Sequence, residues 1–254
     1  MLGAALTGAL PASATDGVAE INQTCATQTG CFAGDSAGFP VTITTSGSYR
    51  LTSNLILPNE NTNGIRISFN DVGIDLNNFA ILGSVSCIGT PVSCAPSGGT
   101  GVGILVTVPE FSGIAVRNGS VRGMGSYGVR LGDQAAVTHV LARWNGSVGI
   151  GTGSGSTVSG NTVYGNGQNG IQAFSGSTDS GNTALSNGTN GISAGNGSTV
   201  SANTVRLNTG FGLNLGFQAG YRENVISGNT AGLVTGISFV NLGNNACNGI
   251  TLCP

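Results

Sequence analysis

The sequence predicts an all-β solenoid with turns of 21 residues and three short strands in each turn. Two columns of asparagine and one of glycine recur at this spacing, and an aliphatic residue follows each of these glycines. Composition alone does not align three independent columns, so the period indicates a structural repeat. The columns are Asn161, Asn182, Asn203 and Asn224; Asn145, Asn166, Asn187, Asn208 and Asn229; and Gly128, Gly149, Gly170, Gly191 and Gly212.

Apolar and polar residues alternate within each turn. Val158 and Val163 each stand between polar residues, and Ile171 and Ala173 flank Gln172. A period of two is typical of strands, and the Gly/Asn pairs between them indicate turns. Three short strands cannot bury their own apolar side, so successive turns must stack at about 4.8 Å per turn. We therefore expect identical residues to lie above one another, with ladders of asparagine at the bends.

The stretch GNTVYGNGQNGI, residues 160–171, resembles the parallel β-helix repeat. Asparagine stacked at a tight corner between the second and third strands is similar to the right-handed parallel β-helix of the pectin-lyase-like superfamily. The resemblance covers residues 45–245 and implies the fold. It implies no single activity, because the superfamily holds lyases, hydrolases, adhesins and phage tailspikes.

The predicted domain organisation has four parts. Residues 1–14 read as the remnant of a signal peptide, because they are small and apolar and end in an A-x-A pattern. Residues 15–44 form an N-terminal segment, residues 45–245 the solenoid, and residues 246–254 a C-terminal cap. The stretch 39–60 is expected to begin the solenoid and cover its open end, because an uncovered end exposes unpaired strand edges.

Six cysteines fall in three close pairs, and none has the CxxC spacing of a metal site. With a single histidine, a Cys/His zinc finger cannot be completed. We expect three local disulfides, which would place the protein in an oxidising compartment: secreted, periplasmic or at the cell surface. The expected pairs are Cys25–Cys31, Cys87–Cys94 (closing a loop that leaves the solenoid) and Cys247–Cys253.

Charge is scarce. Charged residues make up 7% of the chain and the net charge is −2, against about 25% charged residues in an ordinary soluble protein. Without a basic stripe to neutralise phosphates, we expect no nucleic-acid partner. No apolar run approaches the roughly 18 residues of a membrane span.

Most of the charged residues lie before residue 144. If the protein is an enzyme, this charged cluster is where its site is expected. The resemblance implies that a glycosidase of this fold would use paired carboxylates, and that a lyase would use acidic calcium ligands with an arginine. Calcium is therefore expected only under the lyase alternative. Otherwise no metal or cofactor is expected. The favoured roles of these residues are structural: ion pairing, and shielding of apolar edges from water by the arginine side chains. The cluster is Asp71, Asp75, Arg117, Arg122, Arg130, Asp133, His139 and Arg143.

Three further features carry predictions. Asp179 occupies an inward column otherwise held by valine and tyrosine, which predicts a carboxylate facing the core or a local bulge. Trp144 and Tyr164 lie on adjacent turns, one position apart in register, and could form a platform for a sugar ring. A strip of hydroxyls recurs over three turns and gives ice binding as a remote alternative: Thr157, Ser159, Thr178, Ser180, Thr199 and Ser201.

The favoured function is a secreted or cell-surface, non-catalytic β-helix with a structural or adhesive role. Its expected partners are a polysaccharide or cell-surface glycan, or further copies of the chain joined end to end or side by side. The alternative is a polysaccharide lyase or glycoside hydrolase that uses the charged cluster. The scarcity of charge favours the non-catalytic function, because acid–base chemistry on glycans needs paired carboxylates.

Overall fold

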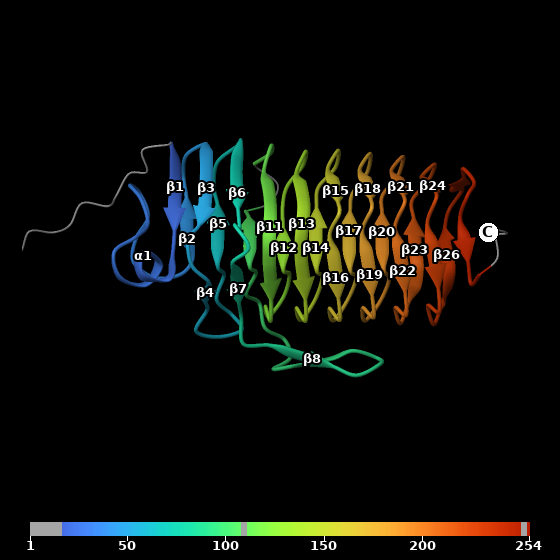
Figure 1. Cartoon of the computed structure of the whole chain (residues 1–254), viewed down its shortest axis with the longest axis horizontal. Coiled ribbons are helices and arrows are strands. Elements are labelled where there is room, and N and C mark those ends of the chain that lie inside the picture. Colours follow the sequence, from blue (N-terminus) through green and yellow to red (C-terminus); the bar gives the residue numbers. More distant parts are fainter. Residues whose placement is uncertain (1–16, 108–110, 250–252) are drawn as a thin grey trace, which may run out of the picture.

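The protein is a single parallel β-solenoid, wound right-handedly (Figure 1). The computed structural model describes residues 17–107, 111–249 and 253–254. Each turn contributes one strand to each of three columns, which confirms the predicted three-strand repeat. Within the described residues, all pairings between successive turns are parallel and in the predicted register, as in Ile150↔Ile171↔Ile192. The predicted stretch 1–14 lies outside the described residues.

The first strand of each turn belongs to a sheet of its own, which we call the first-strand face. Its members are β2 (Val41–Ile43), β5 (Ile65–Ile67), β10 (Ile104–Val106), β12 (Val129–Arg130), β14 (Ile150–Thr152), β17 (Ile171–Ala173), β20 (Ile192–Ala194), β23 (Phe211–Leu215) and β26 (Gly232–Gly236).

The second and third strands form one large sheet that bends at a corner. The second-strand face holds β1 (Val18–Ile21), β3 (Gly47–Leu51), β6 (Val72–Asp75), β15 (Thr157–Ser159), β18 (Thr178–Ser180), β21 (Thr199–Ser201), β24 (Gly220–Arg222) and β27 (Val240–Asn241). The third-strand face holds β4 (Leu55–Ile56), β7 (Ala80–Leu82), β16 (Thr162–Tyr164), β19 (Thr183–Leu185), β22 (Thr204–Arg206), β25 (Val225–Ser227) and β28 (Ala246–Cys247). Two strands run through the corner and belong to both faces: β11 (Ala115–Arg122) and β13 (Ala136–Arg143).

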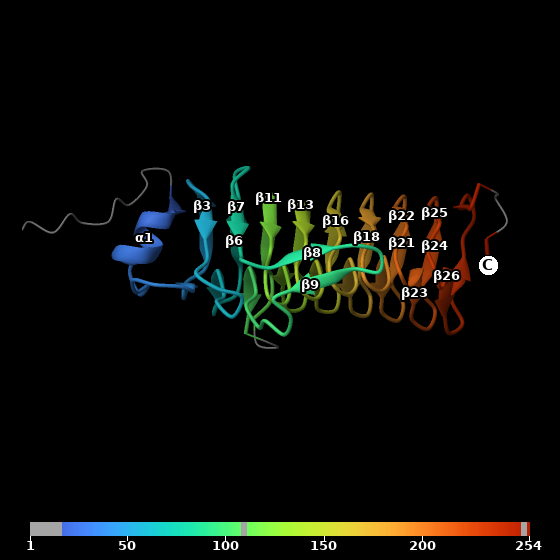
Figure 2. The same cartoon turned by 90° about the horizontal axis from the view of Figure 1, so that it is seen from below.

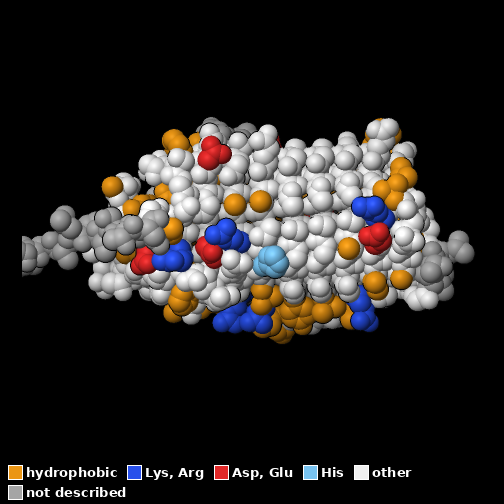
Figure 3. Space-filling view, turned by 45° about the horizontal axis from the view of Figure 1, so that its top comes forward, with side chains coloured by type: hydrophobic (Ala, Val, Ile, Leu, Met, Phe, Trp, Pro, Cys, Tyr) orange, Lys and Arg blue, Asp and Glu red, His pale blue; other side chains and the backbone are white. Residues whose placement is uncertain are grey.

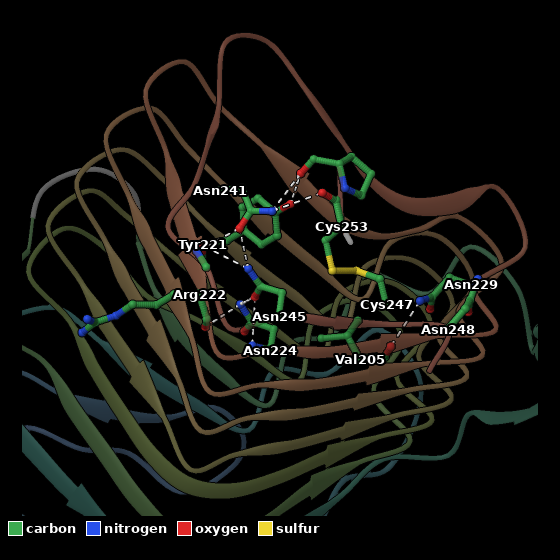
Figure 4. The surroundings of a disulfide bond; sticks show 12 residues. Val205, Tyr221, Arg222, Asn224, Asn229, Asn241, Asn245, Cys247, Asn248 and Cys253 are labelled. Carbon is green, nitrogen blue, oxygen red and sulfur yellow. Dashed lines mark hydrogen bonds between the residues drawn. A yellow bond between two sulfur atoms is a disulfide. The ribbon is translucent and has the colours of Figure 1, made fainter. Parts of the chain in front are cut away.

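The asparagine columns form two buried ladders. In each, the side-chain oxygen accepts from the backbone and side-chain amides one turn earlier, as between Asn166 and Asn187 at 3.1 and 2.9 Å. The second amide hydrogen goes to a strand carbonyl, for Asn187 that of Val163. These bonds satisfy polar groups that would otherwise be costly to bury. The corner ladder continues one turn further than predicted, to Asn245 (Figure 4).

A third ladder, formed by serine, was not predicted from the sequence. The hydroxyl oxygen of Ser156 accepts from the amide of Ala135, and Ser177 and Ser198 repeat the contact on the next turns. All three serines are buried. Serine is abundant throughout the chain, so this column does not stand out from the composition as asparagine does.

The solenoid is longer than predicted at both ends. Strand β1 already pairs with β3, and β28 extends the third-strand face beyond residue 245. The stretch 39–60 supplies strands of a complete turn, so it does not act as the cap. Helix α1 (Gln23–Gln28) lies over the N-terminal end, fastened by the Cys25–Cys31 disulfide (Figure 1). Asn22 caps α1 by accepting from the backbone amide of Cys25 at 2.9 Å.

The predicted Cys87–Cys94 loop is an antiparallel hairpin of β8 (Ser86–Ile88) and β9 (Ser93–Ala95). It leaves the solenoid after β7 and runs along its axis beside later turns (Figure 2). Both sulfur atoms lie near the carbonyl oxygen of Asn145, at 3.7 and 3.9 Å. The hairpin is therefore held against turns that follow it in the sequence.

At the C-terminal end, Cys247 points inward in the third-strand column, next to Ile226 in register. Its disulfide to Cys253 brings the last residues back over the final turn (Figure 4). There the Tyr221 hydroxyl and the Asn241 side-chain amide both donate to the carbonyl oxygen of Pro254. All three expected disulfides are thus present.

Candidate functional site

The solenoid separates the predicted charged cluster onto different faces. Asp75 and Arg117 lie on the second-strand face, Arg122 and Arg143 on the third-strand face, and Arg130 on the first-strand face. The remaining three lie in bends: Asp71 before β6, Asp133 after β12 and His139 at the corner inside β13. The eight residues therefore do not form one site.

On the second-strand face, oppositely charged residues alternate over four consecutive turns. The register aligns Glu20 with Arg50, Arg50 with Asp75, and Asp75 with Arg117. Two of these contacts are ion pairs, Arg50–Glu20 at 3.1 Å and Arg117–Asp75 at 3.0 Å. Figure 3 shows this row of red and blue side chains leading to the histidine.

Asp75 is satisfied by its neighbours within this row. Burial opposes its ionisation, but hydrogen bonds from the Asn77 amide and from the Arg117 and Asn118 side chains outweigh burial and lower the pKa of Asp75. A carboxylate held ionised by a salt bridge suits a structural role. The favoured assignment of Asp75 and Arg117 to ion pairing agrees with this geometry.

The first-strand face carries a groove of about 230 Å³. Gly151 lies on its floor, in a column where Arg130 and Gln172 are the neighbours on either side. The rings of Tyr127 and Phe174 line it, and more than half of Phe174 is exposed. A Cβ atom on Gly151 would lie 2.9 Å from the Tyr127 ring, so the missing side chain is what opens the groove.

Polar groups line the same groove. The Arg130 guanidinium lies over the Tyr127 ring, 5.3 Å from its centre. Asp133 accepts a hydrogen bond from the Ser154 amide at 2.7 Å. The Gln172 side chain also lines the groove, two turns after Arg130 in the same column. Concave sites with apolar walls and a few fixed polar groups are typical of small-ligand binding.

Arg130 and Asp133 were among the predicted candidate residues, but their association with Tyr127 and Phe174 was not predicted. The interruption of an outward polar column by Gly151 was visible in the repeat and is the one signal that could have indicated a hollow. Asp133 is the one carboxylate among the described residues that line the groove.

Asp179 faces the core without a bulge. It pairs in register with Val158 and Val200 and is fully buried. Neither carboxylate oxygen has a hydrogen-bond partner, and burial raises the pKa of Asp179 to about 8. The first of the two predicted alternatives is therefore correct, and Asp179 is closed off from any substrate.

The rings of Trp144 and Tyr164 lie edge to face with their centres 6.2 Å apart, and their role as a platform for a sugar ring stays a prediction. They lie on the third-strand face beside the hairpin, away from the groove. The predicted hydroxyl strip is also in register, with Thr157, Thr178 and Thr199 in one column of the second-strand face. Ice binding stays a prediction.

The described residues hold neither a grouping of metal ligands nor a helix that could span a membrane. In residues 17–107, 111–249 and 253–254, no three His, Cys, Asp or Glu side chains are grouped so as to hold a metal ion. No helix in this part of the chain is long and apolar enough to cross a membrane.

The family model described as "Right handed beta helix region" matches residues 100–247, more than half of the chain. The chain belongs to this family of right-handed β-helices. Among curated protein sequences, none matches this β-helix.

Solved structures share the fold of this β-helix at low sequence identity. The Dettilon tailspike protein gp208 has a TM-score of 0.58 and 15% identity, covering 83% of this chain and 50% of the tailspike. Pectate lyase Pel9A has a TM-score of 0.50 and 13% identity, covering 93% of this chain and 71% of the lyase. The A-module of the Azotobacter vinelandii mannuronan C-5 epimerase AlgE4 has a TM-score of 0.49 and 13% identity, covering 91% and 77%. At these identities the likeness shows the fold alone, and the chain spans half the length of the tailspike.

Proposed function

We propose that the protein is an extracellular, non-catalytic β-helix that binds a glycan in the groove of the first-strand face. The observation that carries the proposal is the pair of aromatic rings, Tyr127 and Phe174, that line the groove together with Gly151. Aromatic faces pack against the apolar C–H side of sugar rings, while Arg130 and Gln172 offer hydrogen-bond donors to hydroxyl or carboxylate oxygens.

The size of the groove supports a single sugar unit as its occupant. Its volume of about 230 Å³ lies below the roughly 300–1,000 Å³ of sites for drug-sized ligands. Three disulfides support an oxidising compartment, where cell-surface and secreted glycans occur.

A non-catalytic role is favoured by the state of the carboxylates. Hydrolysis of a glycosidic bond ordinarily needs two carboxyl groups, one on each side of the bond. The groove offers Asp133, whose oxygen is occupied by the Ser154 amide, and Asp75 lies on another face in an ion pair with Arg117.

The test is binding of a panel of neutral and acidic oligosaccharides to the intact protein, measured by calorimetry. Replacing Tyr127 or Phe174 by alanine should weaken binding by about 1 kcal/mol or more, because stacking area is lost. Phe217→Ala is the matched control, since Phe217 is a similarly exposed aromatic residue on a different turn. Equal affinity in Phe174→Ala and Phe217→Ala would exclude the groove as the site.

The enzyme alternative is tested on the same polysaccharides by measuring chain shortening. Depolymerisation that is lost in Asp133→Asn, or in Asp75→Ala, would replace the non-catalytic proposal by a lyase or hydrolase. The thermal midpoint of each variant must stay close to that of the unmodified protein for the result to count.

A further inference from the structure

The third-strand face carries three arginines and no acid in its strands. The outward column reads Arg122, Arg143, Tyr164, Leu185 and Arg206 on five successive turns. At about 4.8 Å per turn, Arg122 and Arg206 lie roughly 19 Å apart along the solenoid axis. Figure 3 shows the corresponding patch, with apolar side chains between two groups of basic ones.

The two adjacent arginines are uncompensated. Arg122 and Arg143 are direct neighbours in register, and neither forms an ion pair with a described residue. Like charges on adjacent strands repel. The Arg143 guanidinium lies over the Trp144 ring at 4.3 Å, and its Nε atom is buried without an acceptor. The guanidinium groups of Arg122 and Arg143 therefore have no carboxylate partner among the described residues, and an anionic group of a ligand could pair with them.

The disulfide-bonded hairpin and the part of this face around Trp144 and Tyr164 border a small open space, which we call the channel. The space has a volume of about 180 Å³ and is lined by Trp144, Tyr164 and Ser186 of the solenoid and, from the hairpin, by Cys87, Ile88, Gly89, Thr90 and Val92. The hairpin runs along the solenoid axis (Figure 2), which is also the direction of the column of arginines given by the strand register. The wall it forms admits a chain lying along the axis, whereas a flat surface such as a membrane would meet the hairpin first.

We propose that Arg122, Arg143, Trp144 and Tyr164, together with the hairpin, form a second binding site that takes an acidic polysaccharide. Carboxylate or sulfate groups of the chain lie on the arginines, and sugar rings pack against Trp144 and Tyr164. The proposal does not depend on the groove of the first-strand face, which lies on another side of the solenoid and is tested with other variants.

The experiment measures binding of polygalacturonate, dextran sulfate and neutral dextran to the full chain at low and high salt. The two acidic polymers should bind, with affinity that falls as salt rises, and dextran should not. Arg122→Gln/Arg143→Gln should weaken binding about tenfold or more, because charge-assisted hydrogen bonds are lost. The matched control is Arg66→Gln/Arg222→Gln, which removes the same charge from exposed positions on the other two faces.

A second variant keeps the arginines in place. Ile88→Glu adds a carboxylate to the exposed side of the hairpin, inside the channel, and should also weaken binding of both acidic polymers. Ile237→Glu is its control, because Ile237 is equally exposed near the C-terminal end (73% for Ile88 and 74% for Ile237).

Several results would overturn the proposal. One is an equal loss of affinity in the channel variants and their controls, which would mean that net charge alone decides. Another is binding of neutral dextran as strong as that of the acidic polymers. A third is binding to vesicles containing phosphatidylserine with none to either polymer, which would assign the face to a membrane.

Discussion

A Cβ atom on Gly170 would lie 2.7 Å from the side-chain nitrogen of Asn187 on the next turn. The same Cβ atom would lie 2.7 Å from the carbonyl oxygen of Gly191 and from a methyl group of Val163. The glycine column therefore reflects close packing against both the asparagine ladder and the backbone of the next turn, and its backbone needs no left-handed conformation. Gly160 and Gly165 differ, since both have positive φ, at 65° and 60°, and make the bends. The repeat thus uses glycine for two separate reasons, close approach and tight turning.

Removing one step of the ladder should be costly. In Asn187→Ala, the amides of Asn166 lose their acceptor, and the Val163 carbonyl and Asn208 oxygen lose a donor, all inside the protein. Each unsatisfied buried group costs about 1–3 kcal/mol. Because several groups lose a partner, we expect the free energy of unfolding to fall by several times this amount. Denaturant unfolding measures this, with Gln172→Ala on the surface as control. A loss no larger than that of the control would contradict the ladder as a source of stability.

Asp179 should make the stability depend on pH. Its pKa is about 8 in the folded protein against 3.8 for an unperturbed group, so the folded state keeps a proton that the unfolded chain releases. The contribution of Asp179 to the free energy of unfolding is therefore greatest below about pH 4, falls as pH rises, and levels off above pH 8.

Asp179→Val should remove this dependence and stabilise the protein by a few kcal/mol at neutral pH. Valine already occupies the same column on both neighbouring turns, so it fits the space. Thermal melting between pH 4 and 9 measures the effect, with Asp133→Asn at an exposed bend as control. If the variant and the unmodified protein keep parallel pH profiles, Asp179 does not carry the buried proton.

The C-terminal disulfide should hold the last turn closed. Replacing Cys247 and Cys253 by serine should destabilise that end by about 2 kcal/mol, as expected for a short disulfide loop. Loss of the contact of Tyr221 and Asn241 with Pro254 should accompany it. Hydrogen exchange measures the effect, and protection should fall in β27 and β28 but not in β14–β16. Uniform loss of protection would show instead that the whole solenoid depends on this bond.

Filling the groove should abolish ligand binding there without unfolding the protein. Gly151→Gln places a side chain on the floor, where Gln172 already shows that the column accepts one. The new Cβ would lie 2.9 Å from the Tyr127 ring, which must shift by a few tenths of an ångström, and at an ordinary contact distance of 3.8 Å from the Val129 carbonyl oxygen. Oligosaccharide affinity should drop while the thermal midpoint changes little. Unchanged affinity would show that the ligand lies elsewhere.

The sequence determined the features that repeat. The 21-residue period, the strand alternation and both asparagine ladders were readable from the sequence, because stacking places residues one period apart in direct contact. The three disulfides were predicted from the close spacing of the cysteines, and for Asp179 the sequence left two alternatives, the core or a bulge. The ends were predicted less well. Helix α1 and strand β1 lie outside the repeat, so no period indicated where the solenoid begins.

Only the tertiary structure decided which functional residues meet. Arg117, Arg122 and Arg130 are close in sequence but belong to three faces, because three strands in one turn point in three directions. Tyr127 and Phe174 lie on different turns, yet they line one groove because the turns stack. The hairpin lies against later turns for a reason outside the repeat, its packing on the carbonyl of Asn145. A period specifies which residues stack, and the path of the chain around each turn specifies which faces they share.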